Sequence, residues 1–114
     1  MHRYLISFDD GTMILAEEDF EAVSAATRAT VNEAKQAGVW NFGGGLFSQR
    51  ASVVAVDGTV TDGPFPETKA VLGGFCVLEL PSRDDALTWA ARFAAACRCP
   101  QEVREIMWDP ESMP

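Results

Sequence analysis

The sequence predicts an α+β domain in which two helices cover one face of an antiparallel sheet, in the ferredoxin-like order β-α-β, hairpin, β-α-β. Three observations support this fold class. Within residues 2–8 and 73–80, apolar residues recur at every second position, as they do in half-buried strands. Apolar residues recur at helical spacing within 18–37 and again after Ser82. Asp57-Gly58 separates two apolar runs, which is typical of a tight hairpin turn.

The length and charge of the chain limit its functions. A chain of 114 residues is long enough for one two-layer core, so we expect a single domain over residues 1–114. A formal net charge of −8 argues against binding to nucleic acid and to anionic membrane surfaces. No apolar run approaches the roughly 20 residues of a membrane span, and the amino terminus becomes polar too soon for a signal peptide. We therefore expect the protein to be cytoplasmic.

The first two elements are a strand at 2–8 and a helix from about 18 to 37. Acidic residues at 17–19 suit a helix start, and Gly38 is a plausible stop. The inward stripe of this helix is expected to contain Phe20, Val23, Thr27, Val31 and Ala34.

A glycine-rich strand is predicted next, over residues 39–48. Its Gly43-Gly44-Gly45 run has two explanations: a ligand or a partner's backbone approaches the sheet there, or the strand simply bends. Residues 51–56 and 59–62 then form the two strands of the hairpin around Asp57-Gly58.

The strand at 73–80 is expected to pair antiparallel with the first strand. The predicted register sets Arg3 opposite Glu79, Leu5 opposite Val77 and Ser7 opposite Phe75. Ser82 and Asp85 resemble a capping box at the start of the second helix, and Ala86, Ala90, Phe93 and Cys97 form its inward stripe. The last strand is predicted at 103–108, followed by a polar, flexible tail at 109–114.

Two helices can cover only one face of this sheet. The other face carries Leu5, Phe75 and Val77, which are too apolar to remain exposed to water. We therefore predict a homodimer joined sheet to sheet, as a dimeric α/β barrel.

The cysteines and the single histidine do not predict a metal centre. Cys76 lies in an apolar strand and is expected to be a buried, inert thiol. Cys97 and Cys99 could form a metal or redox pair, but a zinc site requires about four ligands. The only histidine, His2, is remote in sequence and at the start of a strand, where it is expected to be exposed.

The segment from Asp62 to Lys69, with the sequence DGPFPETK, contains the densest group of stiff backbone and reactive side chains. Pro64 and Pro66 restrict the residues around Phe65, and Pro66 suits the start of a short helical turn through Leu72. Asp62 and Glu67 could divide acid and base roles, with Lys69 holding an anionic group. Alternatively, Asp62 only caps the turn and the other two are solvated.

The same segment resembles the signature of the YCII-related (DGPF) family of small bacterial proteins. Further similarities are Leu72-Gly73-Gly74-Phe75, Asp57-Gly58, and Glu102-Val103-Arg104 near the end. The resemblance implies a ferredoxin-like fold that dimerises through its sheets, and some family members are encoded beside extracytoplasmic-function sigma factors. The chain lacks the interior histidine that marks one branch of that family, and it has Gly43-Gly44-Gly45 where many members have an acidic residue.

From these residues we expect a protein that binds a small organic molecule without a metal or nucleotide cofactor. If it is an enzyme, a lyase-like or isomerase-like proton transfer by Asp62 is the predicted chemistry. The predicted binding residues are Gly63, Pro64, Phe65, Glu67, Lys69 and Arg104. The alternative is a non-catalytic module that contacts a transcription factor, such as a sigma factor.

Overall fold

The computed structural model describes residues 1–48, 50–65 and 72–112. The elements in chain order are β1 (His2–Asp9), the 3-10 helix η1 (Glu17–Asp19), α1 (Phe20–Gln36), β2 (Trp40–Gly45), β3 (Ser52–Val54), β4 (Val60–Asp62), β5 (Leu72–Leu80), α2 (Arg83–Cys97) and β6 (Glu102–Glu105). Expected strands and helices are all present, with shifted ends. The helical turn expected from Pro66 lies outside the described residues, except that Leu72 belongs to β5.

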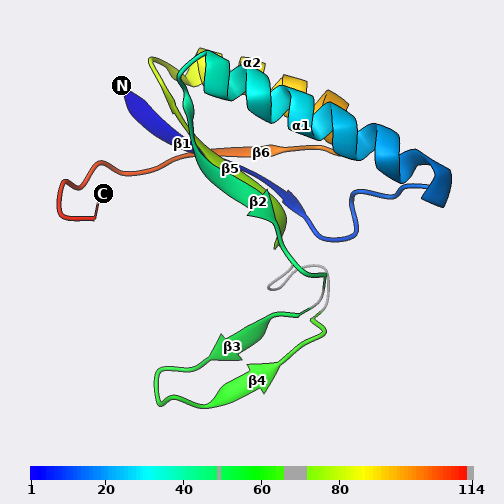
Figure 1. The fold of residues 1–114 in the computed structure, drawn as a ribbon. Helices are drawn as coiled ribbons and strands as arrows, with labels where there is room; N and C mark the ends of the chain where they lie inside the picture. The colour runs from blue at the N-terminus through cyan, green and yellow to red at the C-terminus, as the bar shows by residue number, and fades with distance from the viewer. Residues whose placement is uncertain (49, 66–71, 113–114) are drawn as a thin grey trace.

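The main sheet has four strands in the order β2-β5-β1-β6, and all its pairings are antiparallel. This is the strand order of a ferredoxin-like fold, so the predicted α+β class is confirmed. Helices α1 and α2 lie side by side over one face of the sheet (Figure 1). Within the described chain the sheet is open and does not close into a barrel.

The predicted register between the two central strands is confirmed. Arg3 pairs with Glu79, Leu5 with Val77 and Ser7 with Phe75. The Arg3 Nε and Glu79 Oε2 atoms are 3.7 Å apart at the rim of the face that the helices leave uncovered. Alternation places the apolar residues of these pairs on that same face.

The core lies between the sheet and the two helices. It contains Tyr4, Ile6, Ala34, Val39, Cys76, Leu78, Leu80, Ala86, Ala90 and Phe93. Ala86 and Ala90 let α2 pack closely on the sheet. Helix α2 begins at the predicted cap, where the Asp85 amide donates to Ser82 Oγ at 3.2 Å and Ser82 Oγ donates to Asp85 Oδ2 at 2.8 Å.

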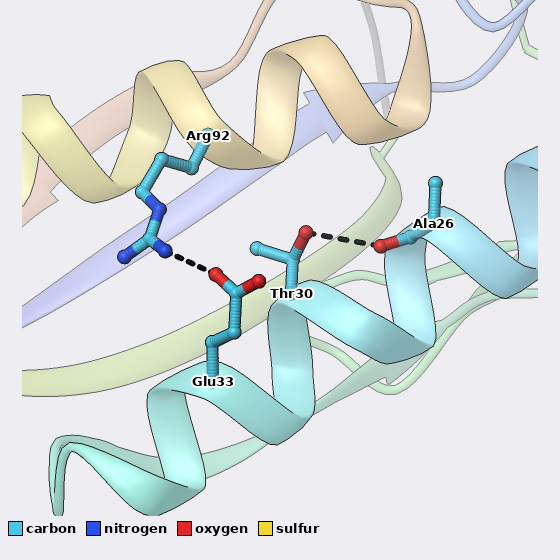
Figure 2. Close-up of polar contacts among 4 residues, drawn as sticks. All are labelled: Ala26, Thr30, Glu33 and Arg92. Carbon is cyan, nitrogen blue, oxygen red and sulfur yellow. Dashed lines mark hydrogen bonds and ion pairs between the residues drawn. The ribbon is translucent and has the colours of Figure 1, made fainter.

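The two helices are joined by polar contacts on their outer side. Figure 2 shows Arg92 of α2 donating a hydrogen bond to Glu33 of α1. The Arg92 guanidinium also lies over the Trp89 ring, 4.2 Å from its centroid. Figure 2 also shows the Thr30 hydroxyl donating to the Ala26 carbonyl at 3.0 Å, a bond within α1.

The predicted hairpin forms, but it stands apart from the sheet. Among the described elements, β3 and β4 contact each other and no other helix or strand, and they project away from the main sheet (Figure 1). The radius of gyration of 15.4 Å exceeds the roughly 13 Å expected of a compact chain of this length. The hairpin is therefore an arm rather than a part of the core.

Two further predictions were inaccurate. Phe20 was placed in the inward stripe of the first helix, but 56% of it is exposed, because it begins α1 beyond the edge of the sheet. The last strand ends at Glu105 rather than Trp108, which is 73% exposed. No helix among the described residues is long and apolar enough to cross a membrane.

Candidate functional site

A cavity of about 460 Å³ lies between α1 and the sheet. Its floor comes from β1, β2 and β5, and its roof from one face of α1 and the end of α2. The lining residues are Ile6, Phe8, Met13, Thr27, Val31, Lys35, Trp40, Gly43, Gly44, Gly45, Phe75, Cys76, Phe93, Cys97 and Gln101. Small-molecule sites commonly measure about 300–1,000 Å³, so the cavity is large enough for an organic ligand.

The end of β2 carries no side chains beside the cavity, because residues 43–45 are all glycine. Gly45 pairs with Gly74 and Gly44 with Phe75, so alternation places Gly45 on the face that α1 covers and Gly44 on the opposite face. A Cβ atom on Gly45 would meet nothing within 4 Å, so space is open above this residue. Gly43 is different, because a Cβ there would lie 2.6 Å from the Phe75 carbonyl oxygen and 2.7 Å from the Cys76 Cα. This glycine lets β2 approach β5 closely. The glycine run therefore shapes the floor of the cavity.

Three residues of α1 face the cavity. Thr27, Val31 and Lys35 are spaced four residues apart, so they lie on one side of the helix. The Thr27 hydroxyl is 3.5 Å from the Cys97 sulfur on α2, which ties the roof of the cavity together. The sequence pattern assigned Thr27 and Val31 to the core stripe and did not single out Lys35. A threonine and a lysine on the same helical stripe as apolar residues were the signal that could have indicated a cavity wall.

The deep end of the cavity is uncharged. Cys76 is buried, as predicted, and burial raises the pKa of its thiol to about 12, with a smaller contribution from Cys97. Cys97 and Cys99 are also buried free thiols that are not in disulfides, and burial raises the pKa of Cys99. No group of three or more potential metal ligands occurs among the described residues. The cavity wall is thus suited to apolar surfaces.

The predicted site residues lie elsewhere. Asp62 is exposed at the end of β4 and accepts a hydrogen bond from Ser52 Oγ at 2.5 Å. The Gly63 amide donates to the Ala51 carbonyl at 2.8 Å, and Pro64 and Phe65 follow at the base of the arm. None of them is among the described residues that line the cavity.

Glu67 and Lys69 lie outside the described residues. Arg104 is on β6, where its Nη1 atom is 2.7 Å from Glu102 Oε2. Its strand partner is Leu5, so it lies on the sheet face opposite the helices and away from the cavity. The structure therefore groups Asp62 to Phe65 near the arm and separates them from Arg104 and from the cavity.

Comparisons with known proteins place this fold in a family. The chain is similar to the structure of 5-chloro-2-hydroxyhydroquinone dehydrochlorinase (TftG) from Burkholderia phenoliruptrix AC1100, solved in complex with 2,5-dihydroxybenzoquinone. The two are 19% identical, with a TM-score of 0.51 over 94% of this chain and 93% of that chain, which shows a shared fold. Curated protein sequences gave no significant match. The profile of the YCII-related domain matches residues 3–107, and the chain belongs to this family.

Proposed function

We propose that this protein binds a small organic molecule in the cavity between α1 and the sheet. The observation that carries the proposal is the cavity itself: about 460 Å³, lined mainly by apolar side chains, with a few polar groups at its margin. The structural neighbour TftG was solved in complex with 2,5-dihydroxybenzoquinone, which supports a small ring compound as the type of ligand.

A thermal-shift screen against small organic molecules tests this proposal. A ligand at 100 times its Kd stabilises the native state by about 2.7 kcal/mol, which raises the melting temperature measurably. Val31→Trp should fill the cavity from α1 and abolish the shift, whereas Ala29→Trp, on the exposed side of the same helix, should preserve it. A ligand that binds both variants equally would place the site elsewhere.

We also propose Asp62 as the proton-handling group of a lyase-like or isomerase-like reaction that needs no cofactor. What supports this role is the carboxylate in the segment that identifies the family, together with the absence of carboxylates and histidines from the described cavity lining. Asp62 is not among the described residues that line the cavity, so this role requires the arm to approach the ligand, from the same protomer or from a partner. Phe65 would then serve as a pocket wall, with Glu67 and Lys69 as binding groups, while Arg104, on the opposite face of the sheet, lies away from this cavity.

The Asp62→Asn variant tests this chemistry. Once a substrate is found, it should lose turnover while ligand binding by the cavity is retained. Ser52→Ala is the matched control, because it removes the hydrogen-bond partner of Asp62 but keeps the carboxylate. Undiminished turnover in Asp62→Asn would end the proposal for Asp62 and leave ligand binding intact.

A sheet-to-sheet homodimer, forming the dimeric barrel, is the assembly we propose. In support, the face without helices carries Leu5, Phe75 and Val77 half-exposed, and Phe42, 66% exposed, packs its ring 5.8 Å from that of Phe75. A stable interface buries about 800 Å² per partner. Val77→Arg should give a monomer in sedimentation velocity, unlike a substitution on the outer side of α2.

Ala91→Arg provides that control, since Ala91 is exposed on the helical side of the molecule. A monomeric wild-type protein at micromolar concentration would refute the dimer. The alternative role, a module that contacts a sigma factor, needs an apolar surface left free after dimerisation. This alternative role stays a prediction, and co-purification with a sigma factor would favour it. Cytoplasmic residence also stays a prediction.

A further inference from the structure

We infer that the ligand of this cavity is a planar aromatic molecule with a single anionic group, which Lys35 binds at the cavity mouth. The inference rests on the proposed function and specifies the ligand class for the same site. Three features of the cavity support it: an uncharged deep end, two aromatic rings near a glycine-rich stretch of β2, and one cation at the rim.

The deep end accepts only uncharged groups. Ile6, Phe93, Cys76 and Cys97 are all at most 5% exposed and line this part of the cavity. Because burial raises the pKa of Cys76 to about 12, its thiol is neutral at physiological pH. Burying a charge against such a wall without a partner is strongly unfavourable. The body of the ligand must therefore be apolar.

The shape of the cavity favours a flat ring. Trp40 and Phe93 both line it, with ring centroids 6.4 Å apart and planes tilted by 36°. The floor beneath α1 at Gly45 presents backbone without a side chain, and a Cβ there would meet nothing within 4 Å. A planar aromatic ring can lie along exposed peptide groups while its edge or face contacts the two aromatic side chains. An alkyl chain gains no such contacts.

The charge pattern places an anion at the rim. Lys35 is the only charged side chain among the described residues that line the cavity, in a chain with a formal net charge of −8. It is exposed, and it takes part in none of the ion pairs found in the described part of the chain. Its long apolar stem can lie along the cavity wall while the ammonium group remains in water. A carboxylate or phenolate on the ligand would meet it there.

Lys35 also lies in the last turn of α1, where a cation balances the helix dipole. This role alone predicts that its loss would change stability but not ligand selectivity. The two roles are therefore separable by comparing ligands that differ only in charge.

Isothermal titration calorimetry with three probes tests the inference: 2-naphthoate, the neutral 2-naphthol, and the aliphatic anion octanoate. Wild type should bind 2-naphthoate about tenfold more tightly than either of the others, and a tenfold change corresponds to about 1.4 kcal/mol. Lys35→Met should weaken 2-naphthoate about tenfold and change 2-naphthol less than twofold. Lys35→Arg should restore binding of 2-naphthoate.

The outcomes separate this inference from the proposed function. Equal effects of Lys35→Met on 2-naphthoate and 2-naphthol, or no effect on either, would overturn the role of Lys35. Octanoate binding as tightly as 2-naphthoate would overturn the aromatic class, and so would no binding of either naphthyl compound. If 2-naphthol binding is lost in Val31→Trp but 2-naphthoate has no advantage, the cavity is the site and only the ligand class is wrong.

Discussion

Replacing Gly43 by alanine should destabilise the sheet at the floor of the cavity. A Cβ at this position would lie 2.6 Å from the Phe75 carbonyl oxygen and 2.7 Å from both the Cα and the Cβ of Cys76. Those distances are at least about 0.7 Å shorter than the 3.4 Å at which ordinary van der Waals contact begins. The neighbouring atoms belong to the backbone and first side-chain carbon of β5, so β2 itself would have to move.

The expected cost follows from two opposing effects. Overpacking of this kind costs about 1–3 kcal/mol, whereas replacing glycine by alanine restricts the unfolded chain and returns about 0.4–1 kcal/mol. Gly43→Ala should therefore lower the free energy of unfolding by about 1–2 kcal/mol. Urea unfolding followed by far-UV circular dichroism measures it, as a lower midpoint at an unchanged slope.

Gly44→Ala is the matched control, because a Cβ at Gly44 would meet nothing within 4 Å. It should be neutral or stabilise the protein by about 0.5 kcal/mol. If the two variants unfold at the same urea concentration, the close approach of β2 to β5 does not depend on the missing side chain. The account of how the cavity floor forms would then be wrong.

Three further predictions concern single side chains. The pKa of Cys76 is raised from 9.0 to about 12 in the folded protein, so the folded state binds more protons than the unfolded state between these pH values. The free energy of unfolding should therefore fall as the pH rises from about 9 to 12. Cys76→Ala should flatten that part of the pH profile of stability. Ser7→Ala should stabilise the protein by about 1 kcal/mol in urea unfolding, because the Ser7 hydroxyl is buried without a hydrogen-bond partner among the described residues; a loss of stability would show that the hydroxyl is satisfied. Glu33→Gln should change the free energy of unfolding by less than about 1 kcal/mol, because the ion pair with Arg92 is half exposed. Arg92→Ala should cost more, since it also removes the contact with the Trp89 ring. Equal losses in the two variants would show that this ring contact does not stabilise the protein.

The central strand pairing was predictable from the sequence because alternation and charge both specify it. A shift by one residue would have moved Leu5 and Val77 to the opposite face and separated Arg3 from Glu79. The start of α2 was predictable for a similar local reason, because the Ser82 hydroxyl accepts a hydrogen bond from the Asp85 amide and donates one to the Asp85 carboxylate.

The cavity was not predictable, because it depends on the separation of α1 from the sheet rather than on any local pattern. Thr27 and Val31 fit a core stripe and a cavity wall equally well in sequence. The position of the hairpin was likewise hidden, since Asp57-Gly58 specifies the turn but not the surface on which the strands lie. The DGPF segment could be recognised, while its distance from the cavity required the structure.

The detached arm divides the chain into two zones with different tolerance to change. A two-stranded hairpin alone is only marginally stable, and β3 and β4 contribute nothing to the described core. Their amide protons should therefore exchange with solvent much faster than those of β1 and β5. Lengthening the turn at Asp57-Gly58, or grafting an epitope there, should leave the melting temperature of the domain unaltered.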